Sequence, residues 1–148
     1  EVRATDGVIS AIDMMLHDYG PDRYSGSVNI EIDHKRSIGE VYEEIHRLQL
    51  RIMKEYHVTM VFGIYAVDED TAAIVDIRRY IGKFVRVNEH VKSFHALYLS
   101  KETGTLYCDL IVDYALRDWK ELRKSFVEYM KKQYSEYEIS LTIETEFV

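Results

Sequence analysis

Length, composition and charge place this chain among small globular proteins. It has 148 residues, of which 47% are hydrophobic and 30% are charged, enough for one domain or two very small ones. The formal net charge of -7 argues against nucleic acid as the main partner, because it would repel phosphate backbones. One cysteine, Cys108, excludes an internal disulfide and a cysteine-rich zinc site, and fits a reducing compartment. No hydrophobic run reaches the roughly 18 apolar residues of a membrane-spanning helix, since charged residues interrupt each run.

The first half of the chain predicts three strands and one helix. Val28, Ile30 and Ile32 alternate with polar residues, which is the period of a strand with one buried face. Ser37 and Glu40 form a capping-box pattern just before apolar residues recur at helical spacing. The expected elements are strands at residues 9–16 and 27–33, a helix at 37–56 and a strand at 58–67.

The second half predicts one helix, followed by the same order of elements. Asp68, Glu69 and Asp70 suit a helix N-terminus, and Asp118 with Glu121 repeats the capping pattern. Cys108 has apolar neighbours on one face of an alternating strand, so we interpret it as a small buried hydrophobic residue. The expected elements are a helix at residues 70–87, strands at 91–99 and 105–114, a helix at 118–133 and a strand at 137–145.

Residues 9–67 and 91–146 therefore form an internal repeat of strand, strand, helix and strand. We predict an α+β fold of two tandem modules, each a three-stranded sheet with helices on one face. The first module is expected at residues 1–68 and the second at 69–148. Each half is too short for a large core, so a second copy of the module or a dimer partner should cover part of each sheet.

One turn carries the clearest resemblance to a known family. Residues 19–23 read Tyr-Gly-Pro-x-Arg, and the strand Ser-Val-Asn-Ile-Glu-Ile-Asp follows at 27–33. Together they resemble the start of the cytoplasmic C-terminal domain of cation diffusion facilitators, which are divalent-metal efflux transporters. Phe-His-Ala-Leu-Tyr at 94–98 and Cys-Asp-Leu-Ile-Val-Asp at 108–113 resemble the appended second copy in a longer-tailed subgroup of that family.

The resemblance implies ferredoxin-like, metallochaperone-like modules through which family members form homodimers. It also implies that metal binding draws two subunits together and favours transport by a membrane-spanning domain outside this chain. We therefore expect a regulatory tail on the cytoplasmic face of the cell membrane, without catalytic activity. Zinc is the expected metal, with manganese, iron or cadmium as other candidates. The chain begins with Glu1 rather than Met, so we also expect a piece of a longer protein whose leading helix is cut short.

Family members whose tails bind zinc use a His on the first strand, a His on the second, and a His and an Asp on the third. In the first module the resemblance places these positions at Ile12, Asn29, Gly63 and Tyr65. None of these is a good zinc ligand, so we expect the first module to have lost the site. Asp13 and His17 are weaker candidates nearby, although a histidine beside a turn also serves local structure.

In the second module the same resemblance names four metal ligands, His95, Asp109, Glu144 and Glu146. One imidazole with two or three carboxylates can complete a zinc shell, and an oxygen-rich set would also suit manganese. Asp113 is a weaker, additional candidate on the strand of Asp109. The alternative is that carboxylates on exposed strand faces only keep the protein soluble.

Two other classes of function stay open on the sequence alone. One is a free-standing ferredoxin-like module that senses a small ligand, and the other is a purely structural dimerisation domain. Tyr107, on an otherwise polar strand face, suits a dimer interface, and Trp119 suits a core or a dimer surface. An enzyme finds no support, because neither a nucleophile elbow nor a glycine-rich phosphate loop is present. The histidines that lie beside turns or on a helix surface receive no role: His34, His46, His57 and His90.

Overall fold

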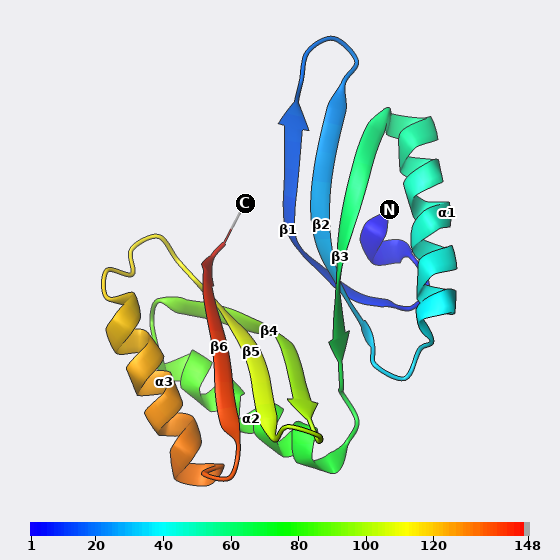
Figure 1. Cartoon of the computed structure of the whole chain (residues 1–148). Coiled ribbons are helices and arrows are strands. Elements are labelled where there is room, and N and C mark those ends of the chain that lie inside the picture. The colour runs from blue at the N-terminus through cyan, green and yellow to red at the C-terminus, as the bar shows by residue number, and fades with distance from the viewer. Residues whose placement is uncertain (147–148) are drawn as a thin grey trace. The chain divides into compact units, whose positions relative to one another are not determined.

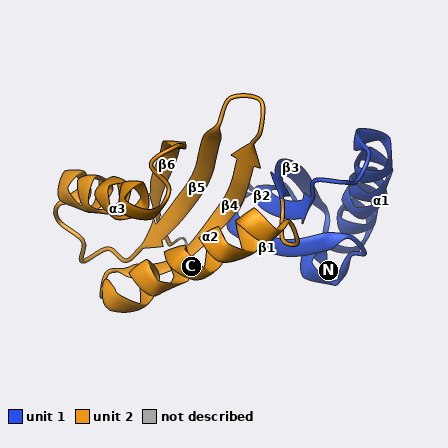
Figure 2. Cartoon of the chain, turned by 90° about the horizontal axis from the view of Figure 1, so that it is seen from below, with its two compact units in different colours: residues 1–67, 147–148 blue, residues 68–146 orange. Residues whose placement is uncertain are grey.

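Two small α+β units make up the chain in the computed structural model, which describes residues 1–146 (Figure 1). The predicted fold class is confirmed, because each unit has one three-stranded sheet with helical cover, consistent with tandem ferredoxin-like modules. Figure 2 colours the units separately: one covers Glu1–Val67 and the other Asp68–Glu146. The expected second module runs to residue 148, and its last two residues lie outside the described part of the chain.

The first unit packs one long helix against its sheet. Strand order is β1-β2-β3, with β1 and β2 antiparallel and β2 and β3 parallel. Val28, Ile30 and Ile32 are buried on the face that α1 covers, as their alternation predicts. The elements in chain order are the short 3₁₀ helix η1 (Val2–Ala4), β1 (Val8–Asp18), β2 (Tyr24–Asp33), α1 (Ile38–Tyr56) and β3 (Val58–Val67).

The second unit repeats this arrangement and has a full helix before its first strand. Strand order is β4-β5-β6, with the same antiparallel and parallel pairs. Figure 2 shows α2 lying along the sheet, and one buried core joins α2, α3 and all three strands. No helix within residues 1–146 combines the length and the apolar character that crossing a membrane requires. The elements are α2 (Ala72–Val87), β4 (Val91–Ser100), β5 (Thr105–Val112), α3 (Trp119–Gln133) and β6 (Glu138–Thr145).

The start of α2 differs from the prediction by two residues. Asp68 was expected to open a helix at residue 70, but its carboxylate instead accepts hydrogen bonds from the backbone N of Asp70 and of Thr71. These bonds close a local turn, so the helix begins only after Thr71. An Asp side chain that bonds the next few amides competes with helix formation at the same residues.

Both first strands carry the same irregularity. The pairing of β1 with β2 shifts after Ile12, and the pairing of β4 with β5 shifts after His95. Asp13 and Ala96 directly follow these positions and have φ values of 52° and 53°, in the left-handed region that L-residues seldom adopt. Such a combination marks a β-bulge, which bends a strand and redirects its side chains. The repeat therefore extends to the backbone path of both strands.

The first helix begins with the predicted capping box. Glu40 donates its backbone N–H to Ser37 Oγ at 3.3 Å, and Ser37 donates its own to Glu40 Oε2 at 3.0 Å. The bond from the Ser37 backbone is the largest cause that lowers the pKa of the Glu40 carboxyl below its usual value. The carboxylate thus stays charged at the positive end of the helix dipole.

We expect Ser37→Ala to lower the free energy of unfolding by about 1 kcal/mol, because it removes the acceptor at the helix N-terminus. Thr71→Ala is the matched control, since Thr71 is the N-cap of α2 and its side chain makes no capping bond. That control should change stability by less than about half as much. Urea unfolding followed by circular dichroism compares the two variants, and equal losses would contradict a role for the capping box.

Candidate functional site

The candidate site lies on the sheet face of the second unit that is opposite α2 and α3. His95 on β4 is the register partner of Asp109 on β5, so both side chains leave the sheet on the same face. Partners in such a pair have Cβ atoms roughly 4.5–5.5 Å apart. Asp109 is 9% exposed and His95 is half-buried. The structure thus brings these two predicted ligands together.

Two local features orient the imidazole of His95. Ser93 lies two residues earlier on the same strand, and its Oγ is 3.2 Å from His95 Nε2. The bulge at Ala96 follows directly, and bulges near functional sites commonly redirect a side chain. A hydroxyl that bonds one ring nitrogen fixes the ring in the way that partners of metal-ligating histidines do. Ser93 is not among the predicted site residues, although it lies two residues from His95 on an alternating strand.

Glu144 and Glu146 lie elsewhere than the expected alignment places them. Thr142 is the register partner of Asp109, whereas Glu144 is the partner of Ile111. Glu146 follows the end of β6, where its backbone N–H donates to the carbonyl of Val112 at 3.1 Å. The side chain directly beside Asp109 on the closing strand is therefore a threonine hydroxyl.

The alignment of the closing strands is corrected by comparing the two sheets. Gly63 on β3 pairs with Asn29, just as Thr142 on β6 pairs with Asp109, so Thr142 is the counterpart of Gly63. The family resemblance had matched Gly63 with Glu144, which lies two residues after Thr142. The physical reason is that α3 has 15 residues against 19 in α1, while its connection to the next strand is longer. The connection and the pairing fix the register, which a strand pattern alone leaves open.

The four expected ligands do not form a closed metal shell. Within residues 1–146, no three of the predicted ligand side chains bring their ligand atoms within 4.8 Å of one another. A structural zinc site needs four donors, and His95 with Asp109 supplies two of them. His95 and Asp109 could hold a divalent ion whose remaining coordination positions are taken by water.

Asp113 is engaged by other partners. It follows β5, and its carboxylate lies 3.0 Å from His90 Nδ1 and 3.2 Å from Lys92 Nζ. Desolvation raises the pKa of Asp113, but hydrogen bonds from Lys92, the Ala115 amide and His90 outweigh it and hold the pKa below its usual value. The ionised carboxylate serves these neighbours. His90, which the sequence analysis left without a role, thus has a structural one.

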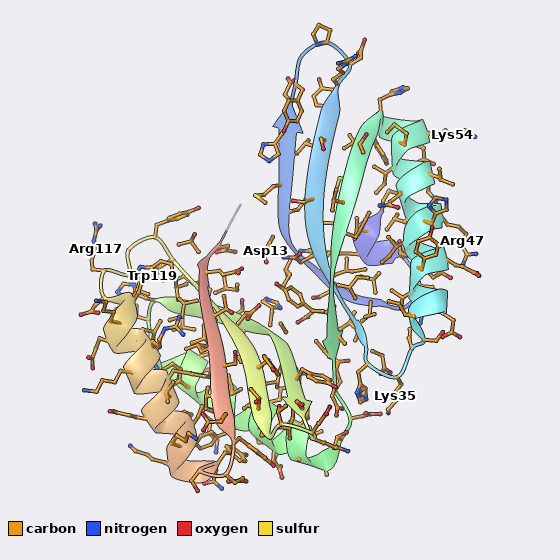
Figure 3. The ribbon with its side chains drawn as sticks, viewed as in Figure 1. Asp13, Lys35, Arg47, Lys54, Arg117 and Trp119 are labelled. Atoms are coloured by element: carbon orange, nitrogen blue, oxygen red, sulfur yellow. The ribbon has the colours of Figure 1, made fainter. Side chains whose placement is uncertain are left out.

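The weaker candidates of the first unit, Asp13 and His17, do not share a group of ligand atoms in the described structure. Asp13 lies in the bulge of β1 (Figure 3) and accepts a hydrogen bond from Asn29 Nδ2 at 3.2 Å. A Cβ on Gly63 would come within 2.1 Å of Asn29 Oδ1, so the glycine leaves room for this amide. His17 is exposed near the end of β1, with its ring 6.2 Å from that of Tyr19.

The turn that carries the family resemblance is held by its own backbone. Tyr19 donates its N–H to the carbonyl of Arg23 at 2.9 Å, and Arg23 donates to the carbonyl of Gly20 at 3.1 Å. Gly20 donates to Asp18 Oδ1 at 2.8 Å and has a φ of 109°, which requires a glycine. These contacts account for the Tyr-Gly-Pro sequence as a tight hairpin connection.

Comparison of the chain with protein-family models, with curated proteins and with solved structures finds no match. The features of the chain that bear on its function are the tandem fold, the turn at residues 19–23 and the facing pair His95 and Asp109.

Proposed function

We propose that this chain is the regulatory and dimerisation region of a divalent-cation efflux transporter, and that its second unit binds the metal ion. The observation that carries the proposal is the pairing of His95 with Asp109 on one sheet face, with Ser93 beside the imidazole. A neutral imidazole and a carboxylate are donors that divalent metals use in proteins. The turn at residues 19–23, which resembles that of the cation diffusion facilitators, supports the same function.

In this proposal metal occupancy regulates how two copies associate. An ion at His95 and Asp109 neutralises the carboxylate and recruits further oxygen ligands, which a second copy can supply. Tyr107 is 43% exposed on the same strand as Asp109, and a tyrosine of this kind suits an interface. The homodimer passes the signal to a membrane-spanning domain at the cytoplasmic face of the cell membrane and catalyses nothing itself.

Zinc is the preferred ion in this proposal, because imidazole with carboxylate is a common zinc donor set. Manganese competes better when more oxygen donors complete the shell, while iron and cadmium stay as further candidates. Glu144 is the nearest acidic residue of the closing strand by register, two partner positions beyond Thr142.

Calorimetric titration of the chelator-treated chain tests the proposal. We expect saturable zinc binding that His95→Ala and Asp109→Asn each weaken by at least about tenfold, a loss of roughly 1.4 kcal/mol in binding free energy. His46→Ala is the matched control, because His46 lies on the exposed side of α1 and stacks on Tyr42. That variant should bind zinc as the unmodified chain does.

The second arm of the test is light scattering with and without zinc, which measures the oligomeric state of the chain. We expect zinc to shift the chain toward a dimer, and His95→Ala to abolish the shift while keeping its melting temperature. A dimer that forms equally without metal, in a folded chain that binds neither zinc nor manganese, would leave the structural dimerisation domain as the function. Tight binding that both substitutions leave unchanged would move the site away from this face.

A further inference from the structure

β3 forms an edge of the first sheet and runs beside α1 (Figure 1). Proteins usually guard a long edge strand with charged side chains, proline or a bulge, because its backbone N–H and C=O groups can pair with another strand. All ten residues of β3 are uncharged, none is proline, and its pairing with β2 runs without a shift of register. Val61 and Ile64 on this strand are 61% and 41% exposed. β3 is therefore an apolar edge without the usual guards.

The second unit shows how the matching edge is guarded. β6 is the edge strand beside α3 and corresponds to β3 in the repeat. Two basic side chains of α3 donate hydrogen bonds to backbone carbonyls along this edge, Arg123 to Leu141 and Lys131 to Tyr137. Carbonyls that already accept from a basic side chain are less available to a further strand, and the charges disfavour an approaching apolar one.

The first unit has apolar or aromatic residues in place of these two basic ones. Arg123 and Lys131 stand five and thirteen residues after the N-cap of α3. At the same distances from the N-cap of α1 the chain has Tyr42 and Leu50, which are 65% and 59% exposed. Leu50 has no donor group, and the ring of Tyr42 stacks on that of His46. α1 thus offers β3 no basic side chain at either position.

One flank of α1 extends the apolar surface of β3. Gln49 marks this flank, because its Nε2 donates to the carbonyl of Met60 at 3.0 Å. Tyr42 and Met53 stand seven residues before and four residues after Gln49, a spacing that places them on the same side of the helix. We call the flank and the strand together the β3 edge surface. Its exposed large side chains are Ile38, Tyr42, Met53, Val61 and Ile64.

Charge and backbone geometry both favour a second copy of this chain as the partner of the surface. The net charge of -7 makes two copies repel one another wherever their carboxylates meet. The side chains that make up the β3 edge surface include no carboxylate, so two copies can approach there without that repulsion. A two-fold axis also sets one edge strand antiparallel to its mate, so that the outward backbone groups of each bond those of the other.

We propose that two copies of the chain associate by pairing their β3 strands edge to edge, which joins the two first sheets into one continuous sheet. The α1 flanks of both copies then lie on the same face of that sheet, where Tyr42 and Met53 lose exposed apolar surface. The contact uses the same surface on both copies, so it closes at two. This inference rests on the proposed function only in that two copies associate, and it names the surface through which they do so.

The guard of the second unit supplies the test. Tyr42→Arg combined with Leu50→Lys, the guarded variant, gives α1 the two basic residues that bond β6 in the repeat. In light scattering with zinc, the guarded variant should need at least about tenfold more protein to reach the same fraction of dimer. Both substituted positions are exposed, so it should keep its melting temperature.

A charge-matched control separates edge blocking from net charge. Val87→Arg combined with Tyr114→Lys changes two exposed residues of the second unit and adds the same two positive charges. Two added positive charges make the chain less negative, which by itself lessens the repulsion between copies. The control should therefore dimerise at least as well as the unmodified chain, whereas the guarded variant should not.

Amide hydrogen exchange shows where the copies meet. In the unmodified chain, exchange within residues 58–67 should slow at least about tenfold between dilute and concentrated samples, because new bonds protect the outward amides of β3. Exchange within residues 138–145, the guarded edge of β6, should not change. Equal dimerisation of the guarded variant and the control would overturn the proposal. So would concentration-dependent protection that leaves β3 unchanged, or a chain that stays monomeric at every concentration with and without zinc.

Zinc calorimetry distinguishes the failure of this inference from the failure of the proposed function. The guarded variant should bind zinc as the unmodified chain does, because its substitutions lie in the first unit and His95 and Asp109 lie in the second. An unmodified chain that binds no zinc, but dimerises unless the guard is present, would refute the metal-binding function and support the β3 contact. A chain that binds zinc and dimerises equally with the guard would do the reverse.

Discussion

Replacing Phe126 with alanine should remove about 3–5 kcal/mol from the free energy of unfolding of the second unit. The side chain is fully buried, and its ring meets that of Phe84 edge to face at 5.1 Å and 82°. The substitution leaves a cavity between α3 and α2 and loses the aromatic contact that joins them. Trp119, the only tryptophan, begins α3 (Figure 3), so its fluorescence during urea unfolding reports on this unit.

Ile45→Ala is the matched control for this prediction. Ile45 stands eight residues after the N-cap Ser37, as Phe126 stands eight residues after the N-cap Asp118. The buried core clusters of the two units share no residue, so Ile45→Ala should leave the Trp119 transition near its original midpoint. A shift of that transition as large as the one caused by Phe126→Ala would contradict separate cores.

Gly63→Ala should lower the stability of the first unit by about 1–3 kcal/mol, because the new methyl group overlaps a neighbouring side chain. Its Cβ would lie 2.1 Å from Asn29 Oδ1, and moving that amide breaks the hydrogen bond from Asn29 Nδ2 to Asp13. Urea unfolding followed by circular dichroism measures the loss. The same experiment on Gly39→Ala serves as the control, because a Cβ there meets nothing within 4 Å and lies in a helix. Gly39→Ala should not destabilise the chain.

A double-mutant cycle assigns the cost to this one contact. In the background of Asn29→Ala the overlap disappears, so Gly63→Ala should then cost less than about half of what it costs alone. If the losses of stability caused by Asn29→Ala and by Gly63→Ala simply add in the double variant, the cost at Gly63 comes from the backbone of β3 rather than from the Asn29 amide.

The order of elements could be predicted because short-range patterns determine it. Alternation at Val28 to Ile32, and the cap at Ser37, place β2 and α1 close to their observed bounds. The cap at Asp118 does the same for α3, since its Oδ1 accepts from the Glu121 amide at 2.8 Å. The bulges carried no such signal, because Ala seldom adopts a positive φ and Asp, although enriched there, adopts it in only a small fraction of cases. Local sequence does not encode a shift that arises from pairing with a neighbouring strand.

The candidate site was predictable in part for the same reason. His95 and Asp109 lie on adjacent strands joined by a short turn, so their pairing follows from the hairpin. The positions of Glu144 and Glu146 depend on how β6 returns from α3, and the length of that connection decides the register. Thr142 could be recognised only after the register was known, whereas Ser93 could have been found by counting along the strand.

The shared bulge also shows how little the bend in each first strand depends on the residue that forms it. Holding an L-residue in the left-handed region costs roughly 1 kcal/mol, yet both halves do so at the same place. The residue is Asp in one half and Ala in the other, while the bend in the strand is the same. The two units thus share one backbone frame at this point and present different side chains on it.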